Sequence, residues 1–193
     1  MPWGDYGDIL FKGFLNVMDE DFNDLDVPEV ERAGPFIPDI YIANSLDIVV
    51  KDKIREALEH DGISGITEFR KTKLKKIVHI DWENWDENSN PKFYPKSGEP
   101  ADYITRGKND EGLFGLIPIL WNLKMVKKNR LNKLSTKPDY VNYSHLQLES
   151  NLLEHEDIFT PENMLHTIVS EKFKNLMEKN SIESVRFIEL QVS

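Results

Sequence analysis

The sequence contains no cysteine, which excludes disulfides, thiol catalysis and cysteine-ligated zinc or iron–sulfur centres. It also lacks any apolar run of about 20 residues, the length that spans a bilayer, so we expect no membrane partner. Residues 1–21 have no positively charged start, and Gly, Asp and Lys interrupt their apolar positions, which argues against a signal peptide. These absences predict a soluble, cytoplasmic protein.

Short catalytic motifs are missing as well. Serine, histidine and aspartate all occur, but no GxSxG segment frames a nucleophile. The glycines form no phosphate-binding loop. We therefore expect a protein that is not an enzyme and that carries no cofactor.

What is present is a balanced, acidic composition. Hydrophobic residues make up 39% of the 193 residues and aromatic residues 10%, enough for a real core, and the 30% charged fraction indicates a well-solvated surface. The formal net charge of −10 disfavours nucleic acid as a partner and favours a basic protein.

Periodicity in the first half predicts alternating strands and a helix. Residues 8–18 suit a strand or a short helix, and a short strand is expected within 34–44. A helix follows with Asn44 or Ser45 as its cap, and Gly62 ends it because glycine accepts the left-handed conformation of a helix end. The apolar face of this helix consists of Val50, Ile54, Ala57 and Leu58. Residues 63–85 then read as a strand, a basic turn and a second strand.

The second half begins after a loop at 86–100. Segment 112–126 is the most apolar stretch and should be core, with Pro118 arguing against an uninterrupted helix. A strand is expected within 139–149. The next helix should start at Thr160 as cap, followed by Pro161 and Glu162, and should end at Lys179 and Asn180. Residues 182–192 complete the chain as a strand.

These elements predict an α+β fold with mixed sheets. We expect a single domain over residues 1–193, with two lobes, 1–90 and 100–193, as the alternative. A shift of 119 positions aligns the two helix–strand units, pairing Val50 with Val169 and Ile54 with Phe173. The units are either a pseudo-repeat or two amphipathic helices that resemble each other by chance.

The C-terminal segment resembles a known signature. The elements concerned are Ile158-Phe159, Ile168-Val169-Ser170-Glu171, Phe173-Lys174, Leu176-Met177 and Val185-Arg186-Phe187. Together they are similar to the C-terminal signature of a family of bacterial immunity proteins from polymorphic and contact-dependent toxin systems. The resemblance implies a protein that binds and neutralises a cognate toxin without enzymatic activity. The family's usual turn glycine is replaced by Ser184, whereas Gly65 holds that place in the first unit.

Two regions are candidates for binding such a toxin, which should carry a basic surface. The first is the acidic segment 19–31, which combines seven acids with apolar side chains that can anchor an interface. The second is the aromatic pair Trp82 and Trp85. The candidate residues of the acidic segment are Asp19, Glu20, Asp21, Phe22, Asp24, Leu25, Asp26, Glu29 and Glu31.

An alternative function rests on His79, Asp81 and Glu83. The two-residue period of a strand places them on one face, where they could hold a divalent metal in a metal-binding or hydrolytic protein. The competing interpretation is an edge strand with a solvated face. The basic runs 70–76 and 124–133 contain few aromatic residues, so we expect them to pair with the acidic surplus or to coat turns.

Overall fold

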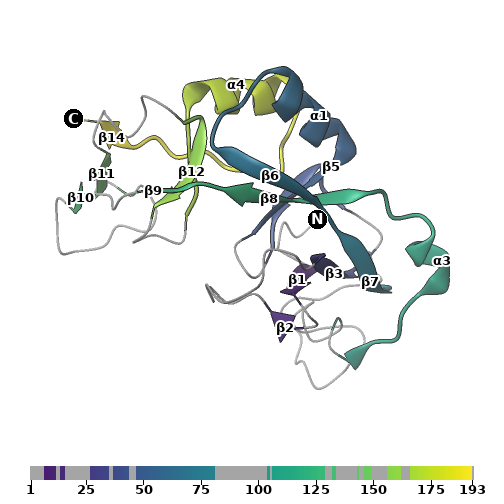
Figure 1. Cartoon of the computed structure of the whole chain (residues 1–193). Coiled ribbons are helices and arrows are strands. Elements are labelled where there is room, and N and C mark those ends of the chain that lie inside the picture. Colours follow the sequence, from purple (N-terminus) through teal and green to yellow (C-terminus); the bar gives the residue numbers. More distant parts are fainter. Residues whose placement is uncertain are drawn as a thin grey trace. The chain divides into compact units, whose positions relative to one another are not determined.

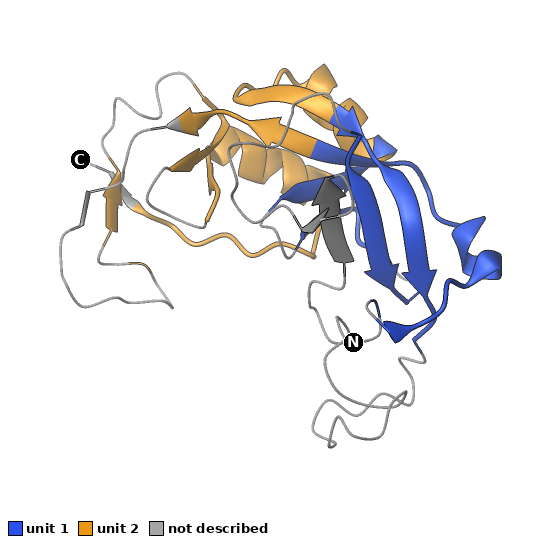
Figure 2. Ribbon diagram, turned by 60° about the horizontal axis from the view of Figure 1, so that its bottom comes forward, with its two compact units in different colours: residues 1–52, 70–122 blue, residues 53–69, 123–193 orange. Residues whose placement is uncertain are grey.

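A computed structural model of the chain describes residues 7–11, 14–15, 27–34, 37–43, 47–80, 104, 106–128, 132–133, 143, 146–148, 156–161 and 166–192. The chain divides into two compact units, each built from separate segments (Figure 2). The first unit comprises residues 1–52 and 70–122, and the second comprises 53–69 and 123–193. Both units are therefore discontinuous in sequence, unlike the two lobes considered above.

The first unit contains a four-stranded sheet in the order β2-β1-β3-β7. Its strands are β1 (Gly7–Phe11), β2 (Phe14–Leu15), β3 (Glu29–Ala33) and β7 (Lys73–Val78). β1 pairs antiparallel with β2 and β3, whereas β3 and β7 run parallel. The described residues of the undecided segment 8–18, which are 8–11 and 14–15, thus form strands, and the sheet is mixed as predicted.

A second set of strands in this unit joins distant parts of the sequence. β4 (Ile40–Ile42) pairs antiparallel with β5 (Ile48–Lys51), and β5 pairs with residues 120–122 of β8 (Leu120–Met125). Val30, Ile37, Tyr41, Ala43, Val49 and Leu120 form its main buried cluster. The strand expected within 34–44 is confirmed as β4, and Tyr41 of β4 and Val49 of β5 both belong to this cluster.

The second unit carries two nine-residue helices, α1 (Asp52–His60) and α4 (Glu171–Lys179) (Figure 1). The first residue of α1, Asp52, is the last residue of segment 1–52 of the first unit. Ile54 and Leu58 are buried on α1, and Phe173, Leu176 and Met177 are buried on α4. β6 (Ile66–Lys71) follows α1, and its first residues lie beside β8, where Thr67 Oγ1 donates to Lys124 O.

Short strands complete the second unit. β12 (Ile158–Pro161) pairs antiparallel with β13 (Ile168–Val169) and parallel with β9 (Lys127–Lys128). β11 (Leu146–Leu148), found where a strand was expected, lies between β10 (Asn132–Lys133) and β14 (Gln191–Val192). Leu146, Leu148, Phe159 and Ile168 form the buried cluster of these strands.

The starts of both helices differ from the prediction. Val50 belongs to β5, so neither Asn44 nor Ser45, which lie outside the described residues, can cap a helix that begins at Asp52. The β-branched run 48–50 favours a strand and pairs with two neighbours, which overrides its helical spacing. Both predicted ends are right: Gly62 has φ +58°, and Asn180 is the C-cap of α4.

The start predicted for the second helix, at Thr160, is wrong, because α4 begins at Glu171. Thr160 and Pro161 belong to β12, and the N-cap of α4 is Ser170, whose side chain accepts a hydrogen bond from Phe173 N. The expected final strand is also mostly wrong, because only Gln191–Val192 forms a paired strand. Residues 182–190 form no strand, so alternation of apolar residues was not sufficient there.

Segment 112–126 is core only in part. From Leu120 onward it forms β8, with Leu120 and Leu123 buried, but the preceding residues include Leu116, which is 77% exposed. α3 (Glu111–Phe114) is only four residues long, and Gly115 and Pro118 follow it. So short a helix cannot bury a continuous apolar face, and the prediction that the whole segment is core is wrong.

Candidate functional site

The described part of the acidic segment is neutralised within the first unit. Glu29 Oε1 and Oε2 lie 3.7 and 3.9 Å from the Nζ atoms of Lys73 and Lys75, and Glu31 Oε1 lies 3.2 Å from Lys75 Nζ. These pairs form because β3 and β7 are adjacent and parallel. The prediction that the basic run 70–76 pairs with acids is confirmed for these two lysines. Glu29 and Glu31 thus face lysines of their own unit.

The other predicted binding residues cannot be compared in the same way. Asp19, Glu20, Asp21, Phe22, Asp24, Leu25, Asp26, Trp82 and Trp85 lie outside the described residues. Their part in toxin binding stays a prediction. Val27, which follows Asp26 in the sequence, lies among the described residues and is 59% exposed.

The alternative metal site is described only at His79. This histidine follows β7 and is exposed, while Asp81 and Glu83 lie outside the described residues. Within the described ranges, no three His, Cys, Asp or Glu side chains are grouped closely enough to hold a metal ion. The metal-binding interpretation therefore stays an untested alternative.

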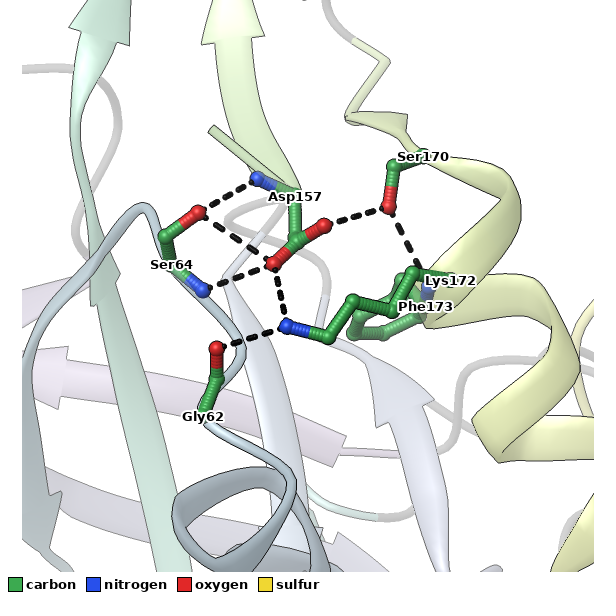
Figure 3. A network of polar contacts seen from close by, with 6 residues as sticks. All are labelled: Gly62, Ser64, Asp157, Ser170, Lys172 and Phe173. Atoms are coloured by element: carbon green, nitrogen blue, oxygen red, sulfur yellow. Dashed lines mark hydrogen bonds and ion pairs between the residues drawn. The ribbon is translucent and has the colours of Figure 1, made fainter. Parts of the chain in front are cut away.

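Among the described residues of the second unit, a network of hydrogen bonds and one ion pair centres on Asp157 (Figure 3). Its Oδ2 accepts hydrogen bonds from Ser64 N at 3.0 Å and Ser64 Oγ at 3.2 Å, and its Oδ1 accepts one from Ser170 Oγ at 2.7 Å. Lys172 Nζ lies 3.1 Å from Oδ2 and also donates to Gly62 O at 2.8 Å. We call these five residues the Asp157 network.

The position of each member follows from local structure. Gly62 and Ser64 belong to the turn that follows α1, whereas Ser170 caps α4 and Lys172 lies in its first turn. Asp157 immediately precedes β12. Figure 3 shows the carboxylate between the turn and the helix, so one side chain joins three segments that are distant in sequence.

Close backbone contact brings these segments together. A Cβ atom on Gly65 would lie 1.9 Å from Ile158 O, and Gly65 has φ +94°. Gly65 O also accepts a hydrogen bond of 2.9 Å from Val126 N. Only glycine accepts this positive φ and also lacks the Cβ that would collide with Ile158 O. This gives a physical reason for glycine in the turn before β6.

The electrostatics of Asp157 are those of a structural ion. Burial alone would raise the pKa of its carboxyl group, but hydrogen bonds from Ser64 and Ser170, together with the Lys172 ammonium, outweigh burial and hold the pKa below its ordinary value of 3.8. The carboxylate is therefore ionised at neutral pH and is a weak base. Both serine hydroxyls donate to this carboxylate, but its lowered pKa makes it too weak a base to activate them as nucleophiles.

Sequence reasoning missed this network. Ser170 followed three residues later by Phe173 is a capping signal, but the stronger local pattern at Thr160 and Pro161 obscured it. Ser64 and Asp157 are 93 residues apart and carry no motif. Gly65 was the one usable signal, because a glycine just before a predicted strand can indicate close approach of another backbone.

A depression of about 510 Å³ lies on the exposed side of α4 in the same unit. It is lined by Asp61, Glu171, Lys172, Asn175, Leu176 and Lys179. Its lining contains both acidic and basic side chains, and Lys172 is already held by the Asp157 network. The depression therefore presents no convergent set of groups of one charge or one chemistry.

Comparisons with known proteins add no relative. No protein-family model, no curated protein and no solved structure matches this chain. In the described part of the chain, no helix is both long and apolar enough to cross a bilayer.

Proposed function

We propose that the protein is a cytoplasmic immunity protein that binds a cognate bacterial toxin and neutralises it by covering the toxin's active surface. It acts as an inhibitor through protein–protein contact and has no enzymatic activity of its own. The toxin is expected to present a basic surface to this chain, whose net charge is −10.

The proposal is supported by the burial of the residues that resemble the immunity-protein signature. Those between 158 and 177 fold together: Ile158, Phe159, Ile168, Phe173, Leu176 and Met177 are all buried. Ser170 between them caps α4 and donates to Asp157. The shared pattern thus describes one coherent piece of structure, which supports a common fold for the C-terminal segment.

One part of the signature does not support the proposal equally. Val185, Arg186 and Phe187 correspond to a strand in the family pattern, whereas residues 182–190 form no strand here. The support therefore rests on β12, β13 and α4, and a direct test of binding is needed.

The test is co-expression with the protein encoded immediately upstream of this chain. That protein alone should arrest bacterial growth, and co-expression should restore it and yield a complex of both chains on a tagged column. A neighbour that is harmless, or whose toxicity this chain does not relieve, would overturn the proposal. Repeating the capture in about 1 M salt, where exposed charge pairs are screened, measures the electrostatic share of the affinity.

A further inference from the structure

Arg32, in the first unit, is buried as deeply as the apolar core, with only 1% of its surface exposed. It is the fourth of the five residues of β3, and Val30, two positions earlier, belongs to the main buried cluster of the unit. Because alternate residues of a strand share a face, Arg32 points to the side on which this cluster lies. Its guanidinium carbon lies 4.1 Å from the centroid of the ring of Tyr41, another member of the cluster.

The guanidinium group of Arg32 lacks acceptors for its N–H groups. Within the residues that the structure describes, its Nε and Nη1 atoms are buried and form no hydrogen bond. These two nitrogens belong to different edges of the planar group, and a carboxylate or phosphate can bind with two hydrogen bonds along either edge. On each edge, at least one N–H group is therefore unsatisfied.

The neighbours of Arg32 explain why no acid of the same strand reaches this group. Glu29 and Glu31 alternate with Arg32 along β3, and their carboxylates pair instead with lysines of β7. Directly opposite Arg32, β1 contributes Gly7, which has no side chain, and β7 contributes Ile77, which is fully buried. The positive charge thus lies beside a glycine and an apolar residue.

A buried cation without an anion is energetically unfavourable. Taking a guanidinium group out of water is costly, and buried charges in proteins are therefore paired as a rule. The Tyr41 ring offsets part of this cost through the face of the guanidinium group, but that contact does not satisfy the N–H groups that lie in its plane. The unmet requirement is an anionic acceptor at the edge of the group.

We propose that Arg32 is the centre of a binding site for a small oxyanion, a carboxylate or a phosphate, which accepts hydrogen bonds from the in-plane N–H groups while Tyr41 covers one face. The 1% exposure of Arg32 restricts the ligand to a small anion that is itself buried on binding. The site lies at the end of β3, since Gly34, two residues later, has φ +71°. This inference goes beyond the proposed function and requires no toxin.

The test measures how small anions change the stability of the full chain. Urea unfolding is followed at neutral pH in sodium chloride and with rising concentrations of sodium phosphate or sodium acetate at constant ionic strength, which keeps charge screening equal. An anion that binds only the folded state should raise the ratio of folded to unfolded chain about tenfold for each tenfold increase above its dissociation constant. The two anions distinguish a tetrahedral ligand from a planar one.

Three variants assign the effect to Arg32. Arg32→Met should fold, because replacing a buried ion by an apolar residue of similar volume is often neutral or stabilising, and it should lose the response to anions. Arg32→Lys keeps the charge but not the planar fork, so its affinity for the anion should fall at least about tenfold. Arg106→Met is the matched control: it removes the same charge from an exposed position of the first unit and should keep the response.

The proposal is overturned if neither anion stabilises the wild-type chain, or if Arg32→Met responds as strongly as the wild type does. If Arg32→Met does not fold, wild type and Arg32→Lys carry the comparison, and an equal response of these two overturns the proposal. None of these outcomes bears on toxin binding, so the proposed function is tested separately.

Discussion

α1 and α4 end in the same way, although 119 positions separate them. Both span nine residues, and in both a hydrogen bond of 3.0 Å runs back across the helix end. It joins Ile63 N to Leu58 O in the first helix and Ile182 N to Met177 O in the second. The backbone at the turn also matches, with φ +58° at Gly62 and +56° at Ser181. The similarity seen in the sequence thus extends to the hydrogen bonds of the cap.

The two helix–strand segments differ immediately after this cap. The first continues through Gly65 into the six-residue strand β6, whereas the second continues through Ser184 into residues that form no strand. Gly65 is in contact with the backbone of Ile158, and Ser184 is not among the described residues of positive φ. The helix and its cap are therefore specified locally, while a strand after them forms only where another backbone is available for pairing.

The largest expected effect tests whether the two helices are buried equally. Phe173→Asp and Ile54→Asp each place a carboxylate in a site that is 3% or 0% exposed. An unpaired buried charge costs several kcal/mol, comparable to the stability of a domain, so both should unfold the second unit in urea titrations followed by circular dichroism. Asn175→Asp adds the same charge to the exposed face of α4 and should change little. If only one of the two buried variants kept the urea unfolding curve of the wild-type protein, the two helices would not be equally buried.

The second comparison separates backbone strain from lack of space. Gly62 and Gly65 both have positive φ, but a Cβ on Gly62 has no atom within 4 Å, whereas one on Gly65 lies 1.9 Å from Ile158 O. Gly62→Ala should cost about 1–2 kcal/mol from φ alone. Gly65→Ala should cost at least about 3 kcal/mol, because the turn at Gly65 must also move away from the backbone of Ile158. Equal losses in chemical denaturation would contradict the close contact at Gly65.

A third prediction concerns Asp157, which joins the exit of α1 to the entrance of α4. Asp157→Asn should destabilise the second unit by about 2 kcal/mol, since hydrogen bonds to a charged group are lost or weakened. Ser64→Ala removes a hydroxyl that donates to Asp157 Oδ2 and accepts from Asp157 N, but it leaves the carboxylate and Lys172 in place, so it should cost less.

The pH dependence of Asp157 follows from its lowered pKa. A carboxyl group whose pKa is lower in the folded state stabilises the fold above its unfolded pKa. For Asp157 this contribution should be complete above about pH 4 and lost as the pH falls from 3.8 through the lower native pKa. The unfolding free energy of the wild-type protein should therefore approach that of the Asp157→Asn variant as the pH falls. A difference that is constant from pH 7 to pH 2 would contradict this account.

The smallest effect should be a gain. Ser181 adopts a left-handed conformation that costs a non-glycine residue energy, so Ser181→Gly should raise the unfolding free energy by about 0.5–1 kcal/mol. Ser184→Gly, made where φ is not positive, should lower it slightly because glycine gains more freedom in the unfolded chain. If both substitutions change the stability in the same direction, the cap of α4 does not have the geometry of the cap of α1.

The sequence predicted those features whose signals are local. The α+β class, the pair β6 and β7, and the helix ends at Gly62 and Asn180 all follow from short patterns of apolar and turn residues. The start of α4 was misplaced because Thr160 and Pro161 form a good cap in isolation, while β12 is specified by pairing with β9 and β13. Competition of this kind is decided by residues tens of positions away.

Sequence reasoning about the candidate surfaces also succeeded only in part. From charge balance the basic run 70–76 was expected to pair with acids or to coat turns, and Lys73 and Lys75 do pair with Glu29 and Glu31. The exposure of Leu116 was not, because apolar composition alone cannot distinguish a buried strand from a loop that turns outward.

The interleaved segments have a consequence for synthesis on the ribosome. Residues 53–69 emerge early, but Asp157, which holds Ser64, follows 93 residues later. At typical elongation rates this interval lasts roughly 5–20 seconds. Throughout it, the nascent helix α1 has neither β12 nor α4 beside it. The apolar face of Ile54 and Leu58 is then a natural site for chaperone binding, and slowing elongation between these segments would prolong that exposure.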